Sequence, residues 1–133
     1  MINLEPQILS AVAGDLLSSF PSLIFEGSAN YSPAKFPYVC GEEADNYVYT
    51  PSRDSNSNEN NVVLMYEFNV FTNSMGRKKA EATDIIAVLD ATMNRLGFTR
   101  TTKKPFNYSN ATVYRVVLRY MAVADAQGNI YWR

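Results

Sequence analysis

The clearest pattern of hydrophobic and polar residues lies between residues 61 and 97. In residues 62–72 every even position from Val62 to Val70 is apolar, whereas the odd positions mix apolar residues with Glu67 and Asn69. Because successive side chains of a strand point to opposite faces, this alternation predicts a strand with one buried face and one partly covered face. Apolar residues then recur at helical spacing, which predicts an amphipathic helix over 76–96.

The chain before this unit is expected to form a helix, two extended segments and a loop. Apolar residues at helical spacing, with Pro6 in the first turn and Pro21 at the end, predict a helix over 5–20 that packs on the sheet. Residues 23–26 and 36–43 read as extended, and Pro37 is expected to keep the second segment away from the sheet centre. Residues 45–60 are polar and rich in Ser and Asn, so we predict a long surface loop with a functional role.

The last third of the chain predicts antiparallel hairpins. Gly97 is placed to end the helix, and the pattern after it predicts these segments: a strand over 98–103, a hairpin loop over 105–111, a strand over 112–124, a turn over 125–129 and a short strand over 130–133. We therefore expect an α+β fold in which residues 1–133 form a single domain. Two helices would pack on a mostly antiparallel sheet, with a strand–helix–strand–strand core in the second half.

The second face of this sheet is only half apolar. Arg115 and Arg119 would alternate there with apolar residues, which are Val63, Met65, Phe71, Val117, Met121 and Val123. An apolar surface of this extent needs a cover. Either the helix over 5–20 covers this face, or a neighbouring subunit does.

Composition and charge limit the classes of function that are open to this chain. The 133 residues are 47% hydrophobic and 19% charged, as in globular proteins, and the formal net charge of −1 provides no field to attract nucleic acid or an anionic membrane. The single cysteine, Cys40, forms no internal disulfide, and neither a signal peptide nor a membrane span is evident, so we expect a soluble protein made in a cytoplasm. The chain has no histidine, which removes the commonest general base and most zinc sites.

Acidic residues offer one candidate site. Glu42, Glu43, Asp45 and Asp54 supply the oxygen ligands that hard divalent cations prefer. Their spacing matches no metal-binding loop of defined geometry. We favour a solvated acidic loop over a metal site.

Basic and aromatic residues offer a second candidate site, for contact with a partner. Arg77, Lys78 and Lys79 begin the helix over 76–96, where cations oppose the helix dipole. This placement reflects either packing alone or contact with an acidic partner surface. Together with Lys103 and Lys104 they would form one basic patch. Five rings lie in or beside the predicted loop region and suit an interface, or cap the edge of a small core: Tyr31, Phe36, Tyr38, Tyr47 and Tyr49.

Several segments together resemble the small head–tail joining proteins of long-tailed bacteriophages, and among these most of all the tail terminator or tail completion proteins. The segments that carry the resemblance are 36–39, 42–46, 59–60, 66–73, 79–82, 97–98, 114–120 and 125–131. The likeness extends from about residue 23 to the end of the chain, and it is one of sequence texture rather than of a catalytic motif.

The resemblance implies a non-enzymatic virion protein without cofactor or metal, made in the host bacterial cytoplasm. It would form a hexameric ring that caps the tail tube and joins it to neck or head completion proteins, with no membrane contact and no sequence-specific nucleic-acid binding. We expect the subunit or partner contacts to involve these residues: Glu42, Glu43, Asp45, Arg53, Asp54, Arg77, Lys78 and Lys79. The alternatives are another neck protein, a monomeric adaptor, or a small domain built on Glu42, Glu43 and Asp45 that binds a ligand or metal or acts as a carboxylate-dependent enzyme.

Overall fold

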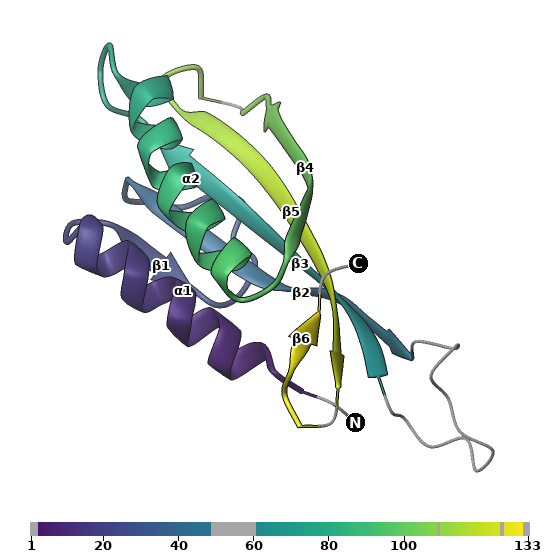
Figure 1. Ribbon diagram of the computed structural model, residues 1–133. Coiled ribbons are helices and arrows are strands. Elements are labelled where there is room, and N and C mark those ends of the chain that lie inside the picture. The colour runs from purple at the N-terminus through teal and green to yellow at the C-terminus, as the bar shows by residue number, and fades with distance from the viewer. Residues whose placement is uncertain (1–2, 49–60, 109, 126, 132–133) are drawn as a thin grey trace.

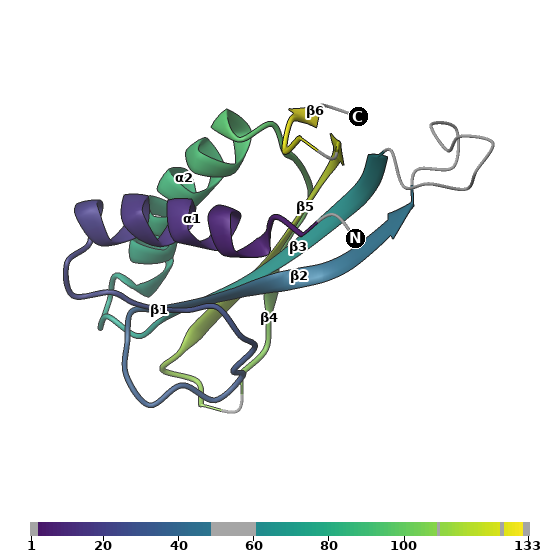
Figure 2. The same ribbon diagram turned by 90° about the horizontal axis from the view of Figure 1, so that it is seen from below.

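Two helices lie on one face of a twisted sheet in this computed structural model, which describes residues 3–48, 61–108, 110–125 and 127–131 (Figures 1 and 2). The helices are α1 (Glu5–Ser19) and α2 (Lys78–Arg95). The strands are β1 (Ile24–Glu26), β2 (Tyr38–Val48), β3 (Asn61–Thr72), β4 (Thr99–Phe106), β5 (Tyr114–Asp125) and β6 (Ile130–Tyr131). The predicted α+β architecture is confirmed.

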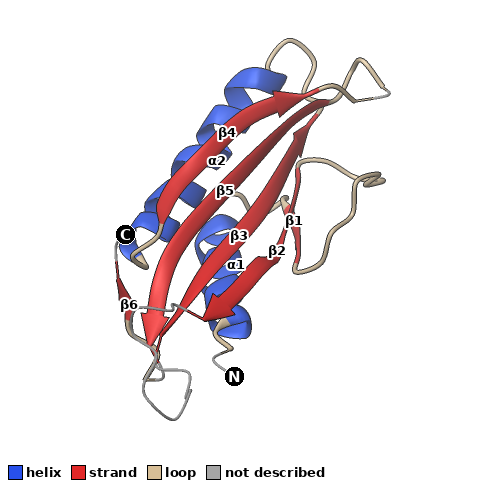
Figure 3. Cartoon of the chain, turned by 90° about the vertical axis from the view of Figure 1, so that its right-hand side faces the viewer, coloured by secondary structure: helices blue, strands red, loops and turns tan. Residues whose placement is uncertain are grey.

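The strand order in the sheet is β1-β2-β3-β5-β4, with β6 paired to β5 (Figure 3). All neighbours are antiparallel except β1 and β2, which are parallel. The central pair, β3 and β5, is in unbroken register from Asn61 opposite Asp125 to Thr72 opposite Tyr114. The strand–helix–strand–strand unit expected in the second half of the chain is therefore the middle and one side of the sheet.

The even side chains of β3 form the centre of the main core, as their alternation predicted. Tyr66 and Phe68 are fully buried, and each meets another ring edge to face: Tyr66 with Phe98 at 5.4 Å between centroids, and Phe68 with Tyr120 at 6.0 Å. Edge-to-face pairs of this kind are favourable beyond their buried area. Burial of each such large side chain stabilises the fold by about 1.5–3 kcal/mol.

The helix boundaries follow from local sequence signals. Pro6 lies in the first turn of α1, where a missing N–H costs nothing. After α2, Gly97 adopts a positive φ of 98°, and the N–H of Phe98 donates to the carbonyl oxygen of Met93 at 2.9 Å. This is the hydrogen bond of a Schellman motif, in which glycine is the favoured residue, and it confirms the predicted end of the helix.

Asp15 joins the two helices. Its Oδ2 accepts a hydrogen bond from Thr92 Oγ1 at 2.7 Å and another from Arg95 Nη2 at 2.9 Å. The hydrogen bond from Thr92, followed by that from Arg95, lowers the pKa of the Asp15 carboxyl. Because this pKa is lower in the folded than in the unfolded chain, the interaction stabilises the fold fully above the unfolded value of about 3.9.

We therefore predict that Asp15→Asn lowers the urea midpoint at pH 7, and that the difference from the wild type narrows as the pH falls below about 4. The stabilisation by the Asp15 carboxylate is lost as the pH falls through its folded pKa. At low pH the wild type therefore no longer has the stabilisation that the variant lacks. Urea unfolding of both proteins between pH 7 and pH 2 measures this. Asp84→Asn is the matched control, since exposed Asp84 makes one 4.0 Å contact with Arg77. A pH-independent difference for Asp15→Asn would contradict the prediction.

β2 is the second strand of the sheet and extends further than the sequence predicted. Pro37 was expected to keep this segment off the sheet centre, and β2, which begins directly after Pro37, lies between β1 and β3, beside the central pair. The loop expected over 45–60 begins too early, because Asp45, Asn46, Tyr47 and Val48 pair with β3. Asp45 and Asn46 are residues that strands disfavour, and pairing with the apolar strand β3 determines their conformation. Residues 49–60 lie outside the described residues.

The hairpin loop predicted over 105–111 also begins too early. β4 continues through Pro105, which pairs with Val116, to Phe106, which pairs with Arg115. Proline is tolerated there because β4 lies at the end of the strand order, and an edge strand has no second neighbour that needs its N–H.

Both helices pack on the same face of the sheet, so α1 does not cover the other one (Figures 2 and 3). The first of the two covers proposed for that half-apolar face is therefore wrong. We call this side of the sheet, which carries the odd side chains of β3 and β5, the open face.

Candidate interface on the open sheet face

One end of the open face is closed by the chain itself. A small second core forms there from Tyr38, Cys40, Phe71 and Val113, with Ile24, Phe36 and Tyr108 packed against it. Cys40 Sγ donates to the carbonyl oxygen of Asn30 at 3.5 Å, and the Tyr38 hydroxyl donates to Glu26 Oε1 at 2.9 Å. Burial, together with the bond to Glu26, raises the pKa of Tyr38 to about 12. This end is therefore structural, and its hydroxyl and thiol stay protonated at neutral pH.

A groove of about 260 Å³ follows towards the middle of the face. We call it the open-face groove, and its lining residues are Tyr31, Glu67, Thr102, Lys104, Phe106, Arg115, Val117 and Arg119. The two exposed rings at its sides are Tyr31 and Phe106, which are 48% and 45% accessible. The groove thus combines cationic groups with aromatic surface, which is a composition enriched at protein interfaces.

Arg115 is held firmly at the inner end of this groove. Its Nε donates to Oδ1 of buried Asn69 at 2.9 Å. Its guanidinium carbon lies 5.0 Å from the ring centroid of Tyr31, 5.6 Å from that of Phe71 and 5.3 Å from that of Phe106. Cation–π contacts on several rings fix the plane of a guanidinium without neutralising its charge.

Two further cations line the groove. Arg119 Nε donates to Glu67 Oε1 at 3.0 Å, and Lys104 Nζ lies 5.8 Å from the ring centroid of Phe106. Burial raises the pKa of Tyr31, with smaller contributions from Glu67 and Glu42. From the part of the chain that the structure describes, the groove therefore presents three cations against the lining carboxylate of Glu67.

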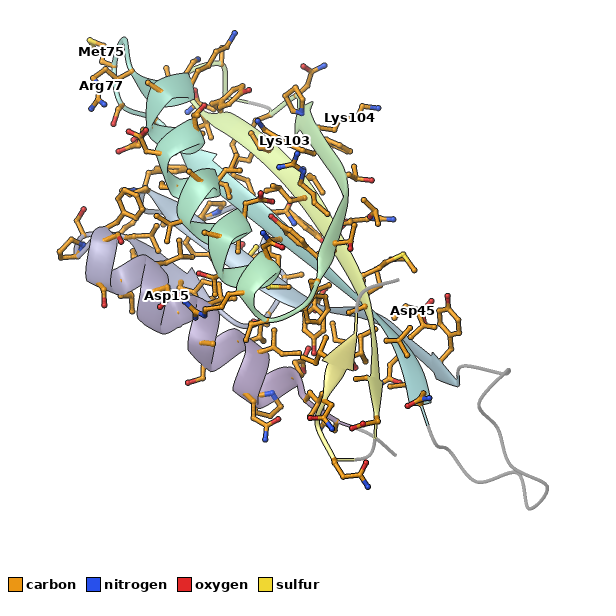
Figure 4. The ribbon with its side chains drawn as sticks, viewed as in Figure 1. Asp15, Asp45, Met75, Arg77, Lys103 and Lys104 are labelled. Atoms are coloured by element: carbon orange, nitrogen blue, oxygen red, sulfur yellow. The ribbon has the colours of Figure 1, made fainter. Side chains whose placement is uncertain are left out.

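A bulge in β4 determines which lysine faces the groove. The register between β4 and β5 shifts between Arg100 and Thr102. After this shift Lys104 pairs with Val117 of the open face, whereas Lys103 pairs with Leu118 of the main core. Figure 4 shows the two lysine side chains on opposite sides of β4.

Beyond the groove the open face becomes apolar. Met65 and Met121 pair there as half-buried neighbours, and Tyr47 beside them is 45% accessible. Methionine and tyrosine both adapt readily to a partner surface. The open face therefore continues as a contact surface past the groove.

The predicted acidic group does not form one site. Glu42 pairs with Glu67 on the open face, and Asp45 pairs with Met65 there after a bulge. Glu43 points to the helix side, where its Oε1 accepts a hydrogen bond from the Tyr66 hydroxyl at 3.2 Å, and burial raises its pKa. Within the described ranges no three acidic or cysteine side chains gather as metal ligands. The structure thus gives no support to the metal-binding alternative.

The predicted basic group is largely used within the chain. Lys78 Nζ donates to the carbonyl oxygen of Ala111 at 2.7 Å. Lys79 Nζ lies 5.8 Å from the ring centroid of Tyr114. Arg77 makes a long, exposed contact of 4.0 Å with Asp84. Figure 4 shows Arg77 and the loop before α2 far from Asp45, at the other end of the molecule. Arg53 and Asp54 lie outside the described residues.

Sequence reasoning selected one lining residue of the groove, Tyr31, among the rings that suit an interface, but it did not select the groove as a site. Arg115 and Arg119 were visible as alternating positions of β5, and Lys104 as part of a basic pair. Their common feature is that they share a face with exposed rings, and this depends on the pairing of β4 with β5. No spacing along the chain shows that pairing.

Comparisons with known proteins show a likeness of fold to solved structures. No protein-family model matches the chain, and no curated protein matches it. Among solved structures, it is similar to a chain from the virion of a native gene transfer agent particle, with a TM-score of 0.50 and 16% sequence identity. The alignment covers 85% of this chain and 90% of that one. At this identity, what the two chains share is the fold.

Neither described helix is long and apolar enough to cross a membrane.

Proposed function

We propose that this chain is a non-enzymatic structural protein of a tailed phage or phage-like virion, which caps the tail tube as a hexameric ring and joins it to the head or neck. The observation that carries the proposal is the likeness of fold to a gene transfer agent virion chain over nearly the full length of both chains. The sequence resemblance to tail terminator proteins points to the same kind of particle and supplies the station at the end of the tube.

The open face supports the ring. A closed ring requires heterologous contacts, in which a surface of one subunit meets a different surface of the next. The open-face groove and the apolar surface around Met65 and Met121 are available for such a contact, because both helices lie on the other side of the sheet. Of the residues first expected at the interface, Glu42 and Asp45 lie on this face and remain candidates for its edge.

The proposal is tested by mass and by capping. Light scattering after size exclusion over a range of concentrations is expected to give a hexamer, or a mass that rises towards one. The purified protein is then added to polymerising tail-tube protein encoded beside it in the same genome. Capping is expected to stop tube growth and to leave one ring at a tube end in electron micrographs.

Tubes of unchanged length and bare ends, at any concentration of the protein, would contradict a tail terminator. Binding to isolated neck complexes with no effect on tube growth would instead indicate another neck protein, which is the alternative within the same class. A strict monomer that neither caps tubes nor binds neck complexes would overturn the virion role altogether.

A further inference from the structure

We propose that the open-face groove binds an acidic segment of a partner polypeptide, whose carboxylates contact Lys104, Arg115 and Arg119 and whose apolar side chains pack on Tyr31 and Phe106. The inference deepens the proposed function and rests on it for the origin of the partner, which would be a neighbouring virion protein. Its chemistry rests on the groove alone.

The charge of the groove is largely unneutralised by the described part of the chain. Among the described residues Glu67 is the one carboxylate that lines the groove, and it is paired with Arg119. Arg115 donates to the amide oxygen of Asn69 instead, and Lys104 lies over a ring. Within the described ranges neither Arg115 nor Lys104 has a carboxylate within ion-pair distance. Arg115 and Lys104 are therefore available for carboxylates of a partner, and Arg119 can contribute although it is already paired with Glu67.

The groove is also preorganised. Arg115 is fixed by Asn69 Oδ1 and by three rings, so binding does not have to order its long side chain. Avoiding that entropy loss favours association. A guanidinium held in one plane also matches a carboxylate by two parallel hydrogen bonds.

A polypeptide suits this groove better than nucleic acid does. Glu67 and Glu42 lie on the same face, opposite one another in the ladder, and they interrupt the cationic surface. Lys103, which would extend the cationic surface along β4, points to the other side of the sheet. A phosphate backbone needs a continuous run of cations, whereas an acidic segment with intervening apolar residues needs the alternation that the groove provides.

The direct test measures binding of a labelled synthetic peptide that alternates Glu or Asp with Phe, by fluorescence polarisation with the full-length protein. A peptide with Gln and Asn in place of the acids is the control for charge, and a single-stranded oligonucleotide of the same length is the control for nucleic acid. The acidic peptide is expected to bind, to bind more weakly as salt is raised, and to bind more tightly than either control.

Two neighbouring lysines provide matched variants. Lys104→Glu reverses a charge within the groove, whereas Lys103→Glu makes the same change one residue away on the opposite face. Both side chains are exposed, so both variants are expected to fold, and a melting curve checks this. Lys104→Glu is expected to weaken peptide binding about tenfold or more, and Lys103→Glu to change it less than about twofold.

Equal weakening by the two variants would overturn the inference, because it would reveal a general field rather than a site. Failure of the acidic peptide to bind would overturn the inference as well. So would an oligonucleotide that binds more tightly than the acidic peptide and loses its binding in Lys104→Glu. The proposed function fails separately: a wild-type protein that binds the peptide but leaves tubes uncapped contradicts capping alone. Normal capping by Lys104→Glu, with no peptide binding by the wild type, contradicts the groove alone.

Discussion

Replacing Phe68 by alanine is expected to lower the free energy of unfolding by about 3–5 kcal/mol, which is the range for deleting a fully buried ring. Phe68 is inaccessible to solvent at the centre of β3, and its ring packs edge to face on Tyr120. Its removal would forfeit the transfer free energy of the ring and leave a cavity between the central strands and the helices. Urea unfolding followed by circular dichroism measures the loss.

Phe106→Ala is the control for this prediction. It removes the same ring from the edge strand β4, where 45% of the side chain is accessible, so a much smaller loss is expected. Similar losses in the two variants would contradict the assignment of Phe68 to the centre of the core. The control has a use of its own, because Phe106 lines the open-face groove and its loss is expected to weaken peptide binding.

Gly41→Ala is the second substitution with a large expected effect, a loss of about 1–3 kcal/mol from overpacking. Gly41 of β2 pairs with Phe68 of β3, and a Cβ at position 41 would overlap the Phe68 ring at Cδ1 and Cε1. The neighbour cannot move aside easily, since Phe68 is itself enclosed. Where space allows, the same substitution stabilises a protein through the unfolded chain, so the sign of the effect is informative.

Gly14→Ala provides the opposite case. Gly14 is exposed within α1, and nothing lies within 4 Å of a Cβ built there, so alanine is expected to stabilise the helix by about 0.5–1 kcal/mol.

In the double variant Gly41→Ala/Phe68→Leu the loss is expected to be smaller than the sum of the two single losses, because leucine vacates the space that the new methyl group needs. Additive losses would show that the two side chains do not compete for space.

The main core was predictable from the sequence because its residues follow the period of their own element. The even positions of β3 needed only strand alternation, and Gly97 needed only the preference of a helix end for glycine. β2 was harder, since Asp45 and Asn46 are residues that strands disfavour. They extend the strand because β3 offers a long partner, and that information lies elsewhere in the chain.

The open-face groove was not predictable for a related reason. Without the bulge between Arg100 and Thr102, strand alternation would place Lys103 on the open face and Lys104 on the helix side. One extra residue reverses this assignment, and bulges leave little trace in a single sequence. The contact of Arg115 with Tyr31 adds a segment that is distant in the chain, so no local pattern contains it.

The position of Pro105 in β4 limits how other chains can add to this edge of the sheet. The last strand of a sheet is a template on which further chains can add by backbone pairing, and unlimited addition of this kind leads to fibrils. β4 carries Lys103, Lys104 and Pro105 in succession, so an incoming strand would meet like charge and a residue with no N–H to donate. Growth into a continuous sheet through β4 is thereby disfavoured, whereas contacts between side-chain surfaces allow an assembly of finite size.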